Sequence, residues 1–303
     1  MDKRFAQPPA APIVETASTG EYYAELVCSR VGVTDVAIRA AYAAVPRERF
    51  LGPGPWLVAS GLGRYIQTPS ADPAFIYDDV VVGLAPERML NNGEPSFHAN
   101  CLRAAAIRPG ETVVHVGAGV GYYSAIMAEL AGPRGRVHAI EIEPVLAARA
   151  AAALQAWPQA EVHARSGLEA PFPDADVIYV NAGVSGLAQP WLEAIRPGGR
   201  MIVPMASGWK GAMFLFTART PRMFEARVVS PTAIIPCVGG QDEMMAQRLA
   251  KAFEGSGGAT AYNPFALPPV RSLWRGTPPD SSCWLEGDGW WLSTEPLPPA
   301  NPN

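Results

Sequence analysis

The chain has 303 residues, of which 49% are hydrophobic and only 17% are charged. Length and composition are typical of a folded protein of one or two domains with a sizeable core. The formal net charge of −4 offers no clustered positive charge of the kind that nucleic-acid binding requires. We therefore expect no nucleic-acid partner.

Targeting and cysteine signals are also weak. No run approaches the ~18 apolar residues of a membrane span, and the first residues lack the apolar stretch of a signal peptide. The four cysteines form no C-x-x-C pair, so neither a zinc site nor a small disulfide framework is predicted. These features predict a cytoplasmic protein with reduced thiols, no membrane partner and no metal.

The N-terminal third is predicted to be helical at first and then rich in turns. Residues 1–20, rich in Pro, Ala and Thr, predict a flexible arm. Helical composition follows over Tyr22–Arg30 and Asp35–Ala44, with Thr34 as the N-cap of the second helix. Dense Pro and Gly punctuation over residues 45–93 predicts a long wrapping segment instead of a core.

A regular alternation of strands and helices begins near residue 96. Ser96 is the expected N-cap of a helix over Phe97–Ile107. The predicted strands are Thr112–Val116, Val137–Ile142, Val162–Ala164, Val177–Val180 and Met201–Val203, and the predicted helices between them are Tyr122–Leu130, Val145–Trp157 and Ala188–Ile195. Strands that are apolar throughout favour a doubly wound, mostly parallel Rossmann-like α/β sheet.

The pattern changes after Pro204. Successive strands without long helices, Ala212–Thr217, Phe224–Val229 and Ala233–Ile235, predict antiparallel C-terminal strands. One helix, Asp242–Phe253, precedes a tail that holds half of the eight tryptophans: Trp274, Trp284, Trp290 and Trp291. Such aromatics pack over a core edge or a subunit interface, so a homodimer through this segment is predicted, with a substrate-facing wall as the minority interpretation.

We accordingly divide the chain into four segments: a flexible arm (1–20), an N-terminal cap (21–100), a Rossmann-like domain (101–240) and a small C-terminal extension (241–303).

The strongest motif is a glycine turn between the first strand of this sheet and its helix. Gly117, Gly119 and Gly121 alternate with Ala118 and Val120. Without Cβ atoms these positions allow a tight turn whose amides, with the helix N-terminus, face a nucleotide-like cofactor. The dinucleotide fingerprint would need a glycine where Tyr122 stands, so NAD and FAD become second choices.

An acidic residue ends the second strand. Glu141 lies twenty residues after Gly121, where a carboxylate can accept hydrogen bonds from both ribose hydroxyls of a nucleotide. Ile142 follows it at the same edge and is placed with the cofactor residues, whereas Glu143 is expected to be solvated or to cap the next helix.

The glycine turn and the strand-end acid resemble the class I S-adenosylmethionine-dependent methyltransferases. Other segments narrow the resemblance to the protein-L-isoaspartate O-methyltransferase family. Val45–Phe50 (VPRERF) is similar to that family's V-P-R-E-x-F, Tyr77-Asp78-Asp79 to its Y-x-D, and Arg196–Pro204 (RPGGRMIVP) to its K-P-G-G-R-L-V-x-P. The resemblance covers residues 22–240 in the right order. It implies S-adenosyl-L-methionine as cofactor, S-adenosyl-L-homocysteine as product and a Rossmann-like methyltransferase fold.

The resemblance also assigns further site residues. Arg165-Ser166-Gly167 stands at the family's adenine-contacting G-D-G, so Ser166 and Gly167 are placed with the cofactor, as is Asn181 at the end of the fourth strand. His115 replaces the acid before the glycine turn. N-P-P-Y, typical of base-methylating enzymes, is absent after Asn181, which disfavours base methylation.

The family's G-Q-T-I-S substrate loop is aligned with Asn92–Ser96, where only the serine is kept. Ser96, His98 and Glu94 are therefore the catalytic candidates, the last two as a general base if the acceptor is a hydroxyl or an amine. Ser96 is equally explained as a helix cap, and His98 as an ordinary core or surface histidine.

The motifs and the resemblance leave three functions open. The first is an O-methyltransferase that acts on a carboxylate, in an isoaspartyl-like residue of a protein or peptide or in a small metabolite, by in-line transfer. The second is a natural-product O- or N-methyltransferase with a reshaped pocket. The third is a noncatalytic module that binds the cofactor and serves regulation. The expected partner is a peptide, protein or small-molecule methyl acceptor.

Overall fold

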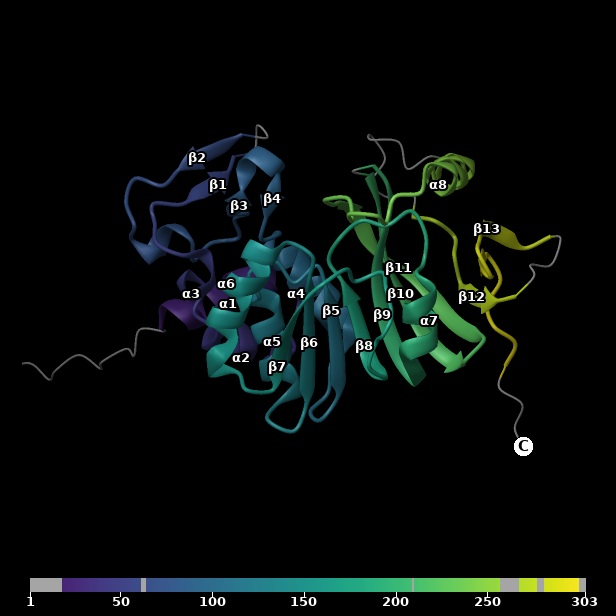
Figure 1. Cartoon of the computed structure of the whole chain (residues 1–303), viewed down its shortest axis with the longest axis horizontal. Coiled ribbons are helices and arrows are strands. Elements are labelled where there is room, and N and C mark those ends of the chain that lie inside the picture. Colours follow the sequence, from purple (N-terminus) through teal and green to yellow (C-terminus); the bar gives the residue numbers. More distant parts are fainter. Residues whose placement is uncertain (1–17, 61–63, 209, 257–266, 277–280, 300–303) are drawn as a thin grey trace, which may run out of the picture.

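The computed structural model describes residues 18–60, 64–208, 210–256, 267–276 and 281–299. Its centre is one ten-stranded sheet with helices on both faces (Figure 1). The parallel half contains β5 (Thr112–Val116), β6 (Arg136–Glu141), β7 (Ala160–Ala164), β8 (Ala175–Val180) and β9 (Ile195–Ser207). These strands lie in the order β9-β8-β5-β6-β7. The predicted doubly wound sheet is confirmed, with its topological switch point between β5 and β8.

The other half of the sheet is antiparallel. It consists of β10 (Lys210–Thr220), β11 (Met223–Ala233), β12 (Ser272–Arg275), β14 (Trp290–Ser293) and β13 (Cys283–Gly287), in that order outward from β9. The predicted separate strand at Ala233–Ile235 is wrong, because β11 runs on to Ala233 without a break. The sequence predicts the tail as a small extension, whereas its described strands continue the main sheet.

Helices on the two faces bury two separate cores. One face carries α1 (Thr19–Arg30), α2 (Val36–Ala44), α4 (Pro95–Ala105), α5 (Tyr122–Ala131) and α6 (Pro144–Ala153). The other carries α7 (Gln189–Ala194) and α8 (Glu243–Gly255), which pack through Trp191 and Leu249. Burial on both faces explains why β5 carries valines at Val113, Val114 and Val116 instead of alternating apolar and polar residues.

Two predicted helix starts are wrong. Asp35, not Thr34, caps α2, since its carboxylate accepts hydrogen bonds from the amides of Ala37 and Ile38. Pro95 occupies the first turn of α4, where its missing N–H costs nothing, so Ser96 lies inside the helix and not at its cap. The segment predicted as an arm falls mostly outside the described residues, but α1 already begins at Thr19.

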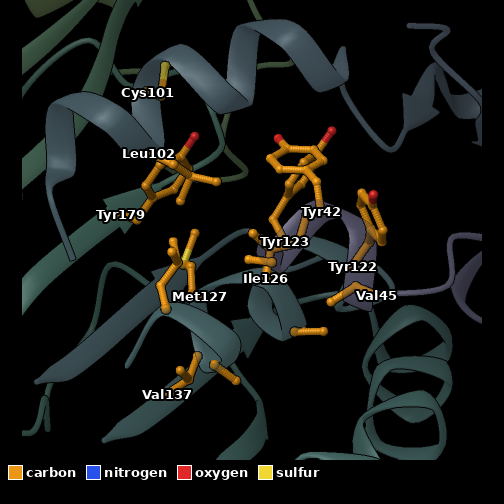
Figure 2. Packing of buried hydrophobic residues seen from close by; sticks show 14 of the residues in the cluster. Tyr42, Val45, Cys101, Leu102, Tyr122, Tyr123, Ile126, Met127, Val137 and Tyr179 are labelled. Atoms are coloured by element: carbon orange, nitrogen blue, oxygen red, sulfur yellow. The ribbon is translucent and has the colours of Figure 1, made fainter. Parts of the chain in front are cut away.

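The cap is a folded layer over one end of the sheet. It contains α3 (Glu48–Leu51), the β1–β2 pair (Leu57–Ala59, Tyr65–Gln67), the β3–β4 pair (Gly83–Ala85, Leu90–Asn91) and the short 3-10 turns η1 (Pro73–Phe75) and η2 (Pro86–Arg88); another 3-10 turn, η3 (Leu154–Ala156), follows α6. Figure 1 shows β1–β4 at the same end of the molecule as α8. Beneath the cap, buried tyrosines of α2 and α5 join the core (Figure 2).

Among the described residues, none of the helices combines the length and apolar character needed to cross a membrane.

Candidate active site

A cavity of about 410 Å³ lies where the parallel strands end. Its walls come from the glycine turn, the ends of β6 and β8, the Ser166-Gly167 loop, the β3–β4 pair and residues 235–238. A volume of this size lies within the ~300–1,000 Å³ of small-molecule sites. The position agrees with the rule that open α/β sheets bind ligands at the carboxyl ends of their strands, at the switch point.

The three glycines of the turn have different tasks. All have positive φ, at +75° for Gly117, +57° for Gly119 and +89° for Gly121, a region that L side chains rarely adopt. Gly117 and Gly119 line the cavity. Gly121 does not line it. A Cβ at Gly121 would lie 2.9 Å from Leu154 Cδ1, so this glycine allows α5 to approach the end of α6.

Glu141 is buried at the cavity wall and organises the turn. One of its carboxylate oxygens accepts a hydrogen bond from the amide of Gly119 at 2.6 Å, and the other accepts one from the amide of Glu143 at 2.9 Å. Burial raises the pKa of the Glu141 carboxyl group, and the two amide donors oppose that rise. The acid and the glycine turn, separate in sequence, form one structural unit.

The structure gathers the remaining predicted cofactor residues around the same cavity. Ala118, Tyr122, Ile142, Ser166, Gly167 and Asn181 all line it. Gly167 allows close packing, because a Cβ there would lie 2.4 Å from Val116 Cγ1. The Gly167 carbonyl accepts a hydrogen bond from the indole of Trp191, which fixes the loop against the sheet.

Sequence reasoning missed two wall segments. Leu84 and residues 88–92 enter the cavity wall from the cap, and residues 235–238 enter it from the end of β11. Arg88 is ion-paired with Glu143 and so links the cap to the end of β6. Asn92 is buried and its Oδ1 accepts a hydrogen bond from the amide of Val82 at 2.7 Å. The substrate loop predicted over Asn92–Ser96 reaches this wall only through Asn92.

The three catalytic candidates do not line this cavity. Ser96 is buried, and its amide donates a hydrogen bond to the Asp79 carboxylate at 2.8 Å. Glu94 is exposed at the start of α4, and its pKa is raised by partial burial and by the neighbouring Asp79. The catalytic roles of Ser96, His98 and Glu94 stay predictions.

His98 is part of a buried aromatic group. Its Nδ1 lies 2.8 Å from the hydroxyl oxygen of Tyr179, and its ring stacks on Tyr123 with a centroid distance of 3.7 Å. Burial lowers the pKa of His98 to about 3. The imidazole is therefore neutral at physiological pH, and its contacts are those of a core residue.

His115 is buried within β5. Its Nδ1 lies 2.8 Å from Ser124 Oγ of α5, and burial lowers its pKa to about 3. A hydrogen bond of this kind ties the strand before the glycine turn to the helix after it.

Comparison with known proteins agrees with this geometry. The profile of the protein-L-isoaspartate(D-aspartate) O-methyltransferase (PCMT) family matches residues 64–242. A protein-L-isoaspartate O-methyltransferase of Gloeobacter violaceus is 29% identical over 212 residues, which cover 68% of this chain and 91% of that protein. A relative from Methylorubrum populi with the same description is 29% identical over 215 residues, 69% of this chain and 90% of its own.

Solved structures show the same fold. One, described as a protein-L-isoaspartate O-methyltransferase, has a TM-score of 0.60 at 22% identity and covers 77% of this chain and 69% of its own. A Plasmodium falciparum structure, described as a putative enzyme of the same kind in complex with S-adenosyl-L-homocysteine, has a TM-score of 0.59 at 14% identity and covers 73% of this chain and 99% of its own. The chain belongs to the protein-L-isoaspartate(D-aspartate) O-methyltransferase family.

Proposed function

We propose that this protein is an S-adenosyl-L-methionine-dependent O-methyltransferase that methylates a carboxylate, in an isoaspartyl-like residue of a protein or peptide or in a small metabolite. The family match supports the reaction class. The observation that carries the proposal is that the glycine turn and Glu141, joined by a hydrogen bond, line one cavity of about 410 Å³.

The residues of the cavity fit this cofactor. Side-chain-free positions at Gly117 and Gly119 leave room for backbone contact with a ligand. The Glu141 carboxylate can accept hydrogen bonds from ribose hydroxyls, and Ile142 and Gly167 offer apolar surface beside it. We assign Gly117, Ala118, Gly119, Tyr122, Glu141, Ile142, Ser166, Gly167 and Asn181 to cofactor binding, and Gly121 to the packing that shapes the turn.

Methyl transfer to a carboxylate requires little acid–base catalysis from the protein. The cofactor supplies an electrophilic methyl group on a positively charged sulfur, and S-adenosyl-L-homocysteine is the product. A carboxylate acceptor is already ionised at neutral pH, so no general base is required. The chain's task is to hold the two reactants in line and to exclude water. Leu84, Leu90 and Ile235 contribute apolar wall to that task.

The acceptor stays a proposal in its details. The wall segments 88–92 and 235–238 line the cavity but are not assigned to the cofactor. We propose that they contact the methyl acceptor, which would be a peptide, a protein or a small molecule. We keep the cytoplasmic location within the proposal, because none of the four cysteines is paired in a disulfide.

Two measurements test the proposal. The full chain with labelled S-adenosyl-L-methionine should transfer base-labile methyl label to an isoaspartyl peptide or to a carboxylate metabolite, and not to the matched aspartyl peptide. Titration calorimetry should show that Glu141→Ala weakens S-adenosyl-L-homocysteine binding by about 1–3 kcal/mol, because charged hydrogen bonds are lost.

The control is Glu254→Gln, which neutralises an exposed acid on α8 outside the cavity wall and should alter affinity by less than about threefold. Equal affinity of the Glu141→Ala and wild-type proteins would contradict the ribose assignment. Tight cofactor binding with no labelled acceptor in a broad set of carboxylates would favour the noncatalytic regulatory module.

A further inference from the structure

Three side chains of metal-binding type meet on the outer edge of the parallel half, and none of them lines the cofactor cavity. His138 lies on β6, and Glu161 and His163 lie on the neighbouring edge strand β7. In the strand register His138 is paired with Glu161. His163 follows Glu161 by two residues, so both project from the same face of the sheet.

The distances fit one shared ion. His138 Nδ1 lies 3.1 Å from His163 Nε2, and each of these nitrogens lies 3.9 Å from Glu161 Oε2. A cation in the plane of the three atoms would lie about 2.1 Å from each of them, within the usual Zn–N and Zn–O bond lengths of ~2.0–2.2 Å, and the out-of-plane position of a tetrahedral ion would require the ligands to move closer together. An ion could therefore reach all three ligands with little rearrangement.

The surroundings of the three side chains suit a cation that binds with moderate affinity, because solvent reaches the site and two arginines lie nearby. The side chains of His138, His163 and Glu161 are 17%, 29% and 69% exposed, so solvent can supply a fourth ligand. Arg136 and Arg165 also lie near His138 and oppose positive charge there.

We propose that His138, Glu161 and His163 form a binding site for a borderline divalent cation, with Zn²⁺ as the first candidate. Two imidazoles and one carboxylate select Zn²⁺, Co²⁺ or Ni²⁺ over Mg²⁺ and Ca²⁺, which prefer all-oxygen sites. The ion would tie the edge strand β7 to β6. No spacing in the sequence signals this group, because the two histidines are 25 residues apart and come together only through strand pairing.

The test uses the metal-free full chain titrated with Zn²⁺ and with Co²⁺. We expect one ion per chain at micromolar concentration, a visible Co²⁺ ligand-field spectrum and a rise in melting temperature with Zn²⁺, because a ligand of the folded state stabilises it. His163→Ala and His138→Ala should each weaken binding by about tenfold or more and abolish the melting shift.

The chain supplies its own controls. It has only four histidines, and the other two, His98 and His115, are buried. Glu243→Gln, which neutralises an exposed acid on α8, should leave metal binding unchanged. Thiols are the same in every variant, so binding through Cys237 or Cys283 would persist in the histidine variants.

Three results would contradict the proposed site: metal binding that persists in the histidine variants, displacement of Co²⁺ by an excess of Mg²⁺, and no metal binding by the wild-type chain. The third result is expected if His138 and His163 are joined only by an N–H···N hydrogen bond. Because the readouts are metal stoichiometry, spectrum and melting, none of these outcomes bears on the methyltransferase proposal.

Discussion

Two buried histidines make the stability of the folded chain sensitive to acid. The pKa of His98 and that of His115 are lowered to about 3 by burial, whereas an unfolded histidine titrates near ~6.5. Below pH ~6.5 the two histidines bind protons in the unfolded chain but stay neutral in the folded chain. Stability is therefore complete above pH ~6.5 and falls as the pH drops toward the folded value.

His98→Gln should reduce this acid sensitivity. Glutamine keeps a polar side chain near Tyr179 but does not titrate. Between pH 7.5 and 5.5 the variant should lose about 1.4 kcal/mol less free energy of unfolding than the wild type, which is the contribution of one histidine over that interval. Urea unfolding at the two pH values measures the difference. An identical loss in both proteins would show that His98 is protonated when folded.

At the scale of elements, the C-terminal tail is a structural part of the sheet. Strands β12–β14 extend β11, and each of the three strands contributes one buried leucine: Leu273, Leu285 and Leu292. Trp290 is only 2% exposed and packs against the backbone of Gly287, where a Cβ would come within 2.2 Å of its ring. These contacts confine the tail to the main core.

Trp290→Ala should therefore destabilise the whole chain by about 3–5 kcal/mol, the usual cost of such a cavity. Trp274→Ala is the matched control, because this side chain is half-buried and stacks on Trp291 at the outer sheet, and it should cost less. Denaturant unfolding gives both numbers. A loss below about 1 kcal/mol for Trp290→Ala would mean that the tail can detach without unfolding the sheet.

The features of this structure that depend on short sequence patterns are predictable from the sequence, whereas those that depend on contacts between distant segments are not. The alternation of strands and helices, the glycine turn and the acid at the end of the second strand are each encoded by short-range patterns and are predictable, whereas the hydrogen bond between Gly119 and Glu141 joins residues of two different strand ends. The packing role of Gly121 is not, because it depends on Leu154 of a later element. The hydroxyl of Ser96 favours a cap, but Pro95 begins the helix one residue earlier. Pairing of tail strands with β11 joins segments that no sequence window contains.

At the scale of the whole molecule, the Trp-rich tail bears on the homodimer. Trp290 and Trp291 are buried inside the chain, so much of the aromatic surface on which that prediction relies is used internally. The homodimer stays a prediction. Among the described residues of this segment, β13 is the terminal strand of the sheet, so a dimer that continues the sheet would form along β13.

One buried arginine links the cap to the rest of the molecule. Arg47 is fully buried, and its guanidinium donates hydrogen bonds to the carbonyls of Ile76, Asp78 and Val80. Its charge lies over the rings of Tyr23 and Tyr122. The segment it holds leads directly into the β3–β4 pair, which lines the cofactor cavity. Arg47, together with the Arg88–Glu143 ion pair, therefore connects the position of the cap to the shape of the cavity.

Arg47→Met should lower the free energy of unfolding by about 3 kcal/mol, because the buried carbonyl of Ile76 loses its donor at a cost of about 1–3 kcal/mol and the part-buried carbonyls of Asp78 and Val80 lose theirs at a smaller cost. Arg47→Lys should recover only part of this, since an ammonium cannot reproduce the planar fork of donors.

Where the variants remain folded, affinity for S-adenosyl-L-homocysteine should fall with the loss of stability, because the cap wall loosens. Arg103→Met, at an exposed site, should change neither quantity. Full stability of Arg47→Met would show that the cap is held by its apolar contacts alone, and unchanged affinity in a destabilised variant would separate the cap from the cavity.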